Sequence, residues 1–392
     1  MTGSLFAFQD ELAAIKSRGL YRQRRVINGP QGVFIRVDGH RRLNFCSNDY
    51  LGHANHPAVV KAYQQAILDY GVGSGSAHLI CGHSKAHQAL EEELAALTGR
   101  QRALLFSTGY MANIGAISAL MSRGDVVFQD RLNHASLLDG GVLAGARLKR
   151  YGHGQMASLE AALKQSKAAR KLIVTDGVFS MDGDLAPLPE LSALAARHQA
   201  GLMVDDAHGM GVLGDRGAGI VELYGLSAED VPILVGTLGK ALGTFGAFVA
   251  GSEALIELFI QKARSYIYTT ALPPAIAEAT RASLKLLNTQ SWRRRKLLAL
   301  VDRFRIGAKQ LGLPIMSTIT AIQPLLIGDA QKTLQISQAL FREGLLVSAI
   351  RPPTVPQDTA RLRITFSADH EEQHIDILLA ALEKIFYESA VL

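Results

Sequence analysis

The chain has 392 residues, 48% of them hydrophobic and 19% charged, a composition that predicts a folded protein with a large core and excludes large-scale disorder. The net charge of +6 comes partly from short arginine clusters and not from a continuous basic stripe, so the sequence does not indicate a nucleic-acid-binding protein. Two cysteines without metal-binding spacing, and no apolar run long enough to span a bilayer, predict a cytoplasmic protein with no metal and no membrane partner.

The N-terminal part of the chain predicts an amphipathic helix over 5–25 and then a hairpin that begins with the alternating segment 32–39. The polar stretch 44–52 contains aromatic residues and is more typical of a loop that forms a site. Residues 71–78 are glycine-rich, but polar residues stand where a dinucleotide-binding fingerprint needs its third glycine. We therefore interpret this segment as a flexible loop and not as a nucleotide site.

From residue 85 onward, helices alternate with short apolar strands, which is typical of an α/β protein. The near-continuous apolarity of the strands predicts a mostly parallel central sheet with helices on both faces. Beyond about residue 290 the pattern changes, which predicts a smaller C-terminal α+β domain. We therefore divide the chain into an N-terminal segment (1–50), a large domain (51–288) and a small domain (289–392). The strands are expected at 103–106, 126–129, 171–175, 202–204, 233–235, 247–250, 322–327, 344–349 and 361–366.

Polar residues follow five of the expected strands, and ligands of open parallel sheets bind beyond the carboxyl ends of the strands. The first group also begins a helix, whose free backbone N–H groups suit a phosphate. Each group has a structural explanation when taken alone, such as a turn glycine or a helix cap. Together they match one ligand that needs an anion site, a carboxylate, a hydroxyl partner, a stacking group and an amine. The groups lie at 107–110, 130–134, 176–180, 205–208 and 237–240.

Lys240 lies just past the strand expected at 233–235, among glycines and other small residues. A lysine in this place is either a solvated loop residue or a Schiff-base lysine for pyridoxal phosphate (PLP), since a desolvated amine loses proton affinity and becomes a usable nucleophile. A phosphate-binding P-loop is excluded, because Leu234 stands where its first glycine should be and Ala241 follows the lysine.

Six motifs in register resemble the α-oxoamine synthase family of PLP enzymes, and the resemblance covers essentially the whole chain. It implies an α/β type I (aspartate aminotransferase-like) fold and pyridoxal 5'-phosphate as cofactor. It also implies a homodimer in which Thr269 and Thr270 reach the active site of the neighbouring subunit. Ala247 is a small departure, because relatives often have a second glycine there. The motifs are NFCSNDYLG (44–52), STGYMAN (107–113), DRLNHAS (130–136), DGVFSMDG (176–183), VDDAHGMG (204–211) and TLGKALGTFG (237–246).

The resemblance also implies a role for each cofactor-binding residue. Lys240 should carry PLP as a Schiff base, Asp205 should pair with its ring nitrogen, and His134 should stack on the ring. These three residues are the expected catalytic set. The remaining contacts are expected from Ser180 and His208 near the ring hydroxyl, and from Gly109, Tyr110 and Thr237 around the phosphate.

Within the family, the segments AIRPPTVP (349–356) and TARLR (359–363) resemble the member that joins L-alanine to a pimeloyl thioester with loss of carbon dioxide. By this resemblance Arg351 should hold the amino-acid carboxylate and Arg22 the far carboxyl group of the pimeloyl chain. The other expected substrate-binding residues are Asn48, His134 and Thr354.

Several alternatives stay open at the level of sequence. The chain could be a family member that uses glycine or serine with a different acyl-CoA, or a PLP-binding protein without catalysis, although the intact set of lysine, aspartate and histidines speaks against the latter. The acyl donor is either coenzyme A or acyl carrier protein. The surplus of basic residues permits an acidic carrier as partner.

Overall fold

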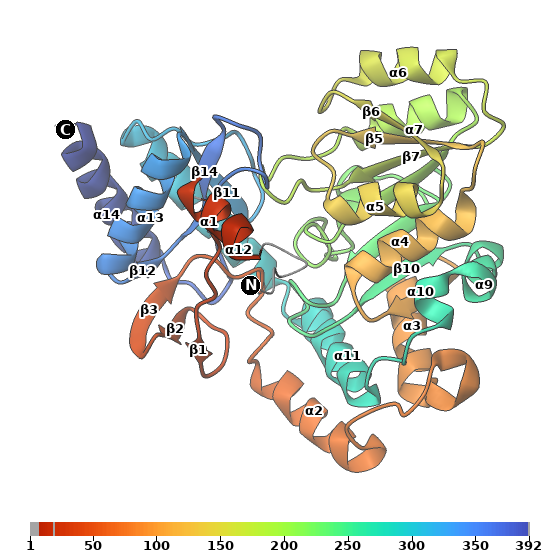
Figure 1. Cartoon of the computed structure of the whole chain (residues 1–392). Helices are drawn as coiled ribbons and strands as arrows, with labels where there is room; N and C mark the ends of the chain where they lie inside the picture. Colours follow the sequence, from red (N-terminus) through yellow and green to blue (C-terminus); the bar gives the residue numbers. More distant parts are fainter. Residues whose placement is uncertain (1–7, 19, 391–392) are drawn as a thin grey trace, which may run out of the picture.

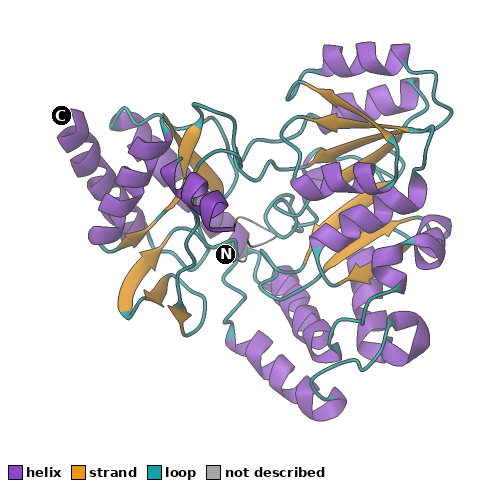
Figure 2. Ribbon diagram, viewed as in Figure 1, coloured by secondary structure: helices purple, strands orange, loops and turns teal. Residues whose placement is uncertain are grey.

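The computed structural model describes residues 8–18 and 20–390. A seven-stranded sheet in the order β4-β10-β9-β8-β7-β5-β6 forms the core of its larger part, at the right of Figures 1 and 2. Strands β9, β8, β7, β5 and β6 pair in parallel, while β10 runs antiparallel to both of its neighbours. The expectation of a mostly parallel sheet is therefore confirmed. The strands are β4 (Arg102–Phe106), β5 (Val126–Asp130), β6 (Arg147–Tyr151), β7 (Lys171–Asp176), β8 (Gly201–Asp205), β9 (Ile233–Thr237) and β10 (Ala247–Gly251).

Alternate residues of each strand enter two separate hydrophobic cores, one on each face of the sheet. In β4, for example, Leu105 packs into one core and Leu104 and Phe106 into the other. Both faces are covered by helices, so near-continuous apolar strands are what this position in the fold requires. The helices around this sheet are α2 (Pro57–Tyr70), α3 (Lys85–Thr98), α4 (Gly109–Leu120), α5 (Ala135–Leu143), α6 (Met156–Gln165), α7 (Leu188–Arg197), α8 (Ile220–Leu223), α9 (Glu253–Lys262), α10 (Arg264–Ile267) and α11 (Pro274–Thr289), with a short helical turn η1 (His78–Gly82).

Strand β6 is absent from the expected set. Its sequence RLKRY carries three basic residues, and most of its side chains are exposed or half-buried. Because β6 pairs only with β5 at the edge of the sheet, its side chains need no continuous apolar pattern.

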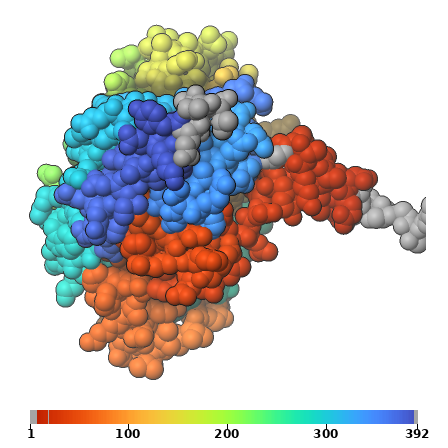
Figure 3. All heavy atoms as spheres, turned by 90° about the vertical axis from the view of Figure 1, so that its left-hand side faces the viewer, coloured from red at the N-terminus to blue at the C-terminus, as the bar shows by residue number. Residues whose placement is uncertain are grey.

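The helix expected over 5–25 is too long. Helix α1 (Phe8–Ser17) ends well before the arginine cluster, residues 20–26 form no helix, and residues 1–7 and 19 lie outside the described part. Arg25 instead stacks on the ring of Phe341, 3.8 Å from its centroid. A tertiary contact thus takes the place of the last helical turns. None of the ten residues of α1 is buried against the rest of the described chain, and Figure 3 shows this N-terminal segment projecting from the body of the molecule.

The expected hairpin is present, with β2 (Phe34–Val37) and β3 (His40–Asn44) joined by Asp38 and Gly39. Both turn residues have positive φ angles, 50° and 82°, as a two-residue hairpin turn requires. The short strand β1 (Ile27–Asn28) pairs with β2.

The C-terminal part lies beside this hairpin, at the left of Figure 1. The strand expected at 344–349 is divided between two sheets, because β12 pairs with β3 and β13 pairs with β14. The sheets have the orders β1-β2-β3-β12 and β11-β14-β13. The elements are α12 (Trp292–Gln310), β11 (Ile322–Gly328), α13 (Ala330–Arg342), β12 (Leu345–Leu346), β13 (Ser348–Ile350), β14 (Ala360–Thr365) and α14 (Glu372–Ala390). The proposed boundary at 288–289 falls at the end of α11. Across residues 8–18 and 20–390, no helix combines the length and apolar character needed to cross a membrane.

Candidate active site

The carboxyl ends of the parallel strands bring the polar groups to one edge of the central sheet. Asp130, Asp176, Asp205 and Thr237 are the last residues of β5, β7, β8 and β9. Asp176 and Asp205 stand opposite each other in the β7–β8 pairing. Two buried carboxylates therefore lie on neighbouring strands at the point where the loop with Lys240 begins.

The side chain of Lys240 is half-buried at this edge, with its Nζ 2.9 Å from His208 Nε2. His208 Nδ1 in turn lies 2.7 Å from the hydroxyl of Tyr50, which comes from the polar loop 44–52. Burial lowers the pKa of Lys240 to about 8, although the charges of Asp205 and Asp176 oppose this shift. Burial and the neighbouring lysine hold the pKa of His208 well below its ordinary value. A neutral imidazole thus supports an amine that loses its proton easily.

The carboxylate of Asp205 is held by neutral donors. Asn113 Nδ2 donates to Oδ2 over 2.6 Å, and the backbone N–H of Ala207 donates to Oδ1 over 3.0 Å. The side chain is nearly inaccessible to solvent. A buried carboxylate that accepts only from neutral donors keeps its negative charge. That charge favours the protonated form of a ring nitrogen placed beside it, because the two opposite charges attract each other away from water.

His134 is fixed by contacts at both its backbone and its ring. Its backbone N–H donates to Asp176 Oδ2 over 2.6 Å, and its Nδ1 lies 2.7 Å from the Ser136 hydroxyl. Asn113 Nδ2 also donates to that hydroxyl, so a continuous chain of hydrogen bonds joins His134 to Asp205. Partial desolvation by the surrounding residues lowers the pKa of His134, although this residue is exposed, while burial and the charge of Asp205 raise the pKa of Asp176 well above its usual range. The His134 ring is therefore uncharged, as a ring that stacks on another aromatic ring should be.

The N-terminus of α4 opens toward the same edge of the sheet. The side chain of its cap residue Thr108 accepts a hydrogen bond from the backbone N–H of Met111, which leaves the first N–H groups of the helix, those of Gly109 and Tyr110, without an intrahelical acceptor. Such a terminus suits a phosphate group. The third predicted phosphate residue, Thr237, donates its hydroxyl to the Gly246 carbonyl over 3.1 Å at the base of the Lys240 loop.

Arg363 joins the site from β14 of the C-terminal part. It is 7% exposed, its Nε donates to the Ser180 carbonyl over 2.7 Å, and Nη2 donates to Asn48 Oδ1 over 3.1 Å. Its charge also contributes to lowering the pKa of both Lys240 and His208. No role was predicted for this arginine, although two arginines within a short strand whose other residues are mostly apolar, ARLRIT, were a usable signal.

The comparisons with known proteins agree with this geometry. A family model described as aminotransferase class I and II matches residues 41–382. The chain belongs to the class I and II aminotransferase family. This aminotransferase-family chain is 62% identical over 375 residues to 8-amino-7-oxononanoate synthase of Nitrosococcus oceani, covering 96% of the chain and 100% of the relative. It is also 62% identical over 371 residues to the synthase of the same name from Methylococcus capsulatus, with 95% and 96% covered.

Two solved structures show how closely the fold is shared. Serine palmitoyltransferase of Sphingomonas wittichii superposes with a TM-score of 0.94 at 31% identity, with both chains fully covered. The 8-amino-7-oxononanoate synthase of Francisella tularensis superposes with a TM-score of 0.78 at 32% identity, covering 89% of this chain and 99% of that one. The fold is the type I PLP-dependent fold that the motifs implied.

The residues expected to bind substrate lie at two separate sites in the structure. Arg22, Arg351 and Thr354 line one cavity of about 290 Å³, where Arg22 Nη2 lies 3.5 Å from the Thr354 hydroxyl. Asn48 lies elsewhere, in the network of Arg363 and Lys240, where it accepts from Tyr50. Tyr50 and Asn113 had no predicted role, and Asp176 was expected only as the first residue of the polar group 176–180, because the contacts of all three depend on which strand ends meet.

A cluster of histidines outside the Lys240 network was likewise not expected. The ligand atoms of His78, His83 and His87 lie within 4.8 Å of one another. Both ring nitrogens of His87 are already engaged, since Nδ1 accepts from the backbone N–H of Ser84 over 2.9 Å and Nε2 lies 2.7 Å from the Leu272 carbonyl. Two rings remain, fewer than the three protein ligands of an ordinary zinc site. The cluster is therefore better explained as a connection between η1 and the start of α3.

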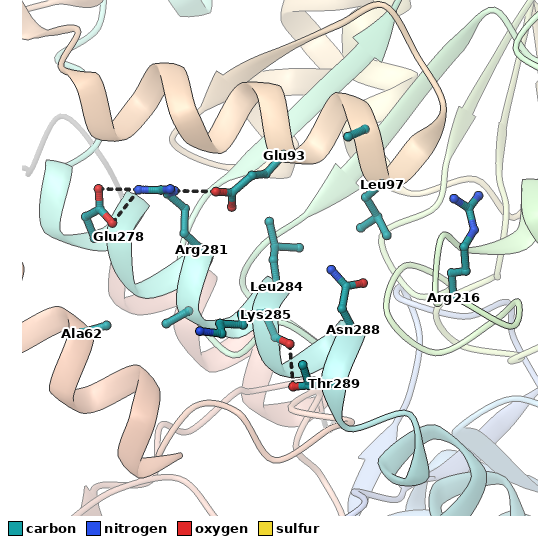
Figure 4. A pocket seen from close by; sticks show the side chains of 12 residues that line it. Ala62, Glu93, Leu97, Arg216, Glu278, Arg281, Leu284, Lys285, Asn288 and Thr289 are labelled. Atoms are coloured by element: carbon teal, nitrogen blue, oxygen red, sulfur yellow. Dashed lines mark hydrogen bonds and ion pairs between the residues drawn. The ribbon is translucent and has the colours of Figure 1, made fainter.

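A separate hollow of about 710 Å³ lies between α2, α3 and α11 (Figure 4). The guanidinium group of Arg281, which lines the hollow, forms ion pairs with Glu93 and Glu278 at 2.8 and 2.9 Å. These charges are satisfied within the hollow, and none of its lining residues takes part in the Lys240 network.

Proposed function

We propose that this chain joins L-alanine to a pimeloyl thioester and releases carbon dioxide, a free thiol and 8-amino-7-oxononanoate. This is the activity of 8-amino-7-oxononanoate synthase, a PLP-dependent acyltransferase of biotin biosynthesis. Two relatives with that name are 62% identical to the chain over the aligned residues. The observation that carries the proposal is the half-buried Lys240, whose amine lies at the sheet edge formed by Asp176 and Asp205 and has its pKa lowered to about 8.

The residues present fit PLP. Lys240 supplies the amine, Asp205 the buried carboxylate for the ring nitrogen, and His134 a neutral ring for stacking. The N-terminus of α4 at Gly109 and Tyr110, with Thr237, suits the phosphate, and Ser180 and His208 are assigned to the ring hydroxyl. When bound, PLP supplies an electron sink for the bonds that change at the α-carbon of the amino acid.

The side chains of the chain supply the proton transfers. Lys240 Nζ, with its lowered pKa, can take the proton from the α-carbon and later return one. His208 holds this amine in place over 2.9 Å, and the hydroxyl of Tyr50 in turn holds the His208 ring over 2.7 Å. Asp205 keeps the proton on the ring nitrogen, and His134 covers the ring and restricts the orientation of the substrate. Asp205 thus stabilises charge, while the neutral imidazoles of His134 and His208 position the substrate and the amine.

The capture of PLP by the cofactor-free protein is expected to depend on pH through Lys240. Only the uncharged amine is a nucleophile, so the rate of capture should rise with pH and level off near the pKa of about 8. A lysine with the ordinary pKa of 10.5 would show a continuing rise to much higher pH. Stopped-flow absorbance at fixed PLP concentration measures this profile, and a rate that keeps rising beyond pH 10 would contradict the assignment.

The amino-acid carboxylate has two candidate partners. The resemblance points to Arg351, whereas the geometry favours Arg363, which is buried beside Asn48 and Ser180 and affects the pKa of Lys240. We propose Arg363 as the main partner.

The substitution Arg363→Gln is expected to raise the KM for L-alanine about 10- to 100-fold, because a hydrogen bond to a charged group contributes about 1.5–3 kcal/mol. The KM for the thioester should change little. Arg351→Gln is the matched comparison, since this arginine lines the cavity with Arg22 and Thr354. If only Arg351→Gln raised the KM for L-alanine, the assignment would return to Arg351.

The cavity of Arg22, Arg351 and Thr354 is proposed to receive the far carboxylate of the pimeloyl group. Arg22→Gln is then expected to raise the KM for a pimeloyl thioester roughly 10-fold, through loss of a charge-assisted contact. It should leave the KM for a heptanoyl thioester, which has the same chain length without the terminal carboxylate, unchanged. Equal effects on both thioesters would contradict this role.

Comparing the kcat/KM of the pimeloyl thioesters of coenzyme A and of acyl carrier protein identifies the natural donor.

A substrate matrix tests the function as a whole. L-Alanine, glycine and L-serine are each combined with pimeloyl and acetyl thioesters, and thiol release is measured. The proposal requires the highest kcat/KM for alanine with the pimeloyl donor. A preference for glycine or serine with another donor would identify a different α-oxoamine synthase instead.

We also propose that the protein is cytoplasmic and forms a homodimer in which each subunit contributes residues to the active site of the other. Thr270 forms a β-bridge with Ala77 on the surface formed by η1 and α10, where Leu79, Ile80 and Tyr268 are exposed apolar side chains. A second copy would cover them. Analytical ultracentrifugation should give a dimer for the wild type and a shift toward monomer for Ile80→Asp, with loss of activity.

A further inference from the structure

His153 lies outside the Lys240 network and bridges two acidic side chains. It lies two residues after the end of β6, with its Nδ1 3.0 Å from Asp130 Oδ1 and its Nε2 2.7 Å from Asp184 Oδ2. The edge of its ring packs against the ring of Phe179, with the centroids 4.4 Å apart and the planes at 85°. With an acceptor at each nitrogen, the imidazole is a doubly donating cation held between two carboxylates. Burial alone would lower the pKa of His153, but the hydrogen bonds and charges of Asp130 and Asp184 together raise it to about 10, so the bridge is intact at neutral pH.

The first acceptor, Asp130, begins the loop that carries His134. Its Oδ1 also accepts from the backbone N–H of Leu132 over 2.8 Å, and its Oδ2 accepts from the backbone N–H of Gly154 over 3.0 Å. Further along the loop, Asn133 Nδ2 donates to the Val174 carbonyl over 2.8 Å. His153 thus fixes the carboxylate around which the first turn of loop 130–134 is folded.

The second acceptor, Asp184, closes the turn that carries Ser180. The backbone N–H of Phe179 donates to the Asp184 carbonyl over 3.0 Å, and that of Gly183 donates to the Phe179 carbonyl over 2.7 Å. On the far side of this turn, Asp182 forms a buried ion pair with Arg361 of β14. The turn 177–184 is therefore fixed to the C-terminal part on one side and to His153 on the other.

We propose that His153 is a positioning residue that sets loop 130–134 relative to turn 177–184, so that His134 and Ser180 reach the same cofactor. The inference rests on the proposed function, because it assigns these two residues to PLP. The loop and the turn follow different strands, β5 and β7, and His153 contacts an acidic side chain of each. Without its two donors, Asp130 and Asp184 would lose the cation between them, and the turn would lose its contact with the β5–β6 edge.

The test compares His153→Phe, which keeps the ring on Phe179 but loses both donors, with His153→Asn, which keeps one donor. The Kd for PLP of the cofactor-free protein is measured by absorbance titration, and kcat and KM are measured with L-alanine and a pimeloyl thioester. We expect His153→Phe to raise the Kd for PLP about 10-fold and to lower kcat about 10- to 100-fold, since small misplacements of positioning groups have effects of this size. His153→Asn should recover part of both losses, and the KM for the thioester should stay unchanged.

His198→Phe is the matched control. This partly buried imidazole lies after α7, at the opposite edge of the sheet, with its Nε2 3.9 Å from Glu160. It should change neither the Kd for PLP nor kcat. Asp184→Asn is the second variant if His153→Phe does not fold, because it keeps the imidazole and Asp130 while weakening the contact with the turn, and it should also raise the Kd for PLP.

The inference is overturned if His153→Phe binds PLP and turns over like the wild type, or if the His198 control loses as much as His153→Phe. It is also overturned if His153→Asn recovers nothing. An inactive wild type that still binds PLP would contradict the proposed function alone, because the Kd for PLP of the variants tests the positioning role independently of turnover.

Discussion

Replacement of Lys240 by alanine is expected to abolish condensation and covalent retention of PLP, while the protein stays folded. Lys240 Nζ is the amine at the sheet edge, 2.9 Å from His208, and no other amine is proposed for this step. Loss of the general base alone is worth about 10²–10⁴-fold in rate, and loss of the covalent attachment adds to this. Thiol release measures the activity, and borohydride reduction followed by peptide mass spectrometry locates the attachment.

The control for this experiment is Lys262→Ala, which removes an exposed lysine at the end of α9. Its activity and PLP content should equal those of the wild type. Thermal unfolding of Lys240→Ala should stay close to that of the wild type, because the truncated side chain leaves the strands and helices around it intact. PLP still found attached to the protein after reduction of Lys240→Ala would show that another amine carries the cofactor.

The substitution Asp205→Asn is expected to leave PLP bound but to lower kcat by at least about 10²-fold, since one preorganised electrostatic contact in a dry site is worth roughly 3–4 kcal/mol. The amide keeps the shape of the side chain and its contacts with Asn113 and Ala207, but it removes the charge that stabilises a protonated ring nitrogen. The KM values for both substrates should change less than kcat. The visible spectrum of the bound cofactor and its pH dependence report the protonation state directly.

Asp215→Asn serves as the matched control for Asp205→Asn, because Asp215 is exposed and lies outside the network of Lys240. Its kcat should be unchanged. A near-normal kcat for Asp205→Asn would rule out the role given to this carboxylate, whereas complete loss of PLP would show that Asp205 is needed for binding and not only for rate.

Local patterns in the sequence predicted the central sheet well. The apolar strands at 171–175 and 233–235 needed only their composition, because strands buried on both faces must be apolar along their whole length. The same reasoning failed for β6, an edge strand with basic side chains, and for the helix expected over 5–25. In both places the structure depends on what the segment contacts, and a contact with a distant part of the chain leaves no local pattern.

The candidate site shows the same division. The order of the motifs placed Asp205 and Lys240 at strand ends, and the rule for parallel sheets brought those ends to one edge. That rule says nothing about which arginine binds the amino-acid carboxylate, because Arg351 and Arg363 both belong to the C-terminal part and not to the parallel sheet. Their places depend on β13 and β14, because Arg351 follows β13 and Arg363 lies within β14, next to Ser180.

The sequence by itself determined the apolar strands of the central sheet and the polar residue types that stand at their ends, because these depend on composition and spacing along the chain. Only the tertiary structure decided that Tyr50 and His208 support the amine of Lys240, that Arg363 joins them, and that His153 connects two separate loops. Hydrogen bonds and pKa shifts depend on distance and burial, and residues such as Tyr50 and Arg363 are neighbours only after the chain has folded.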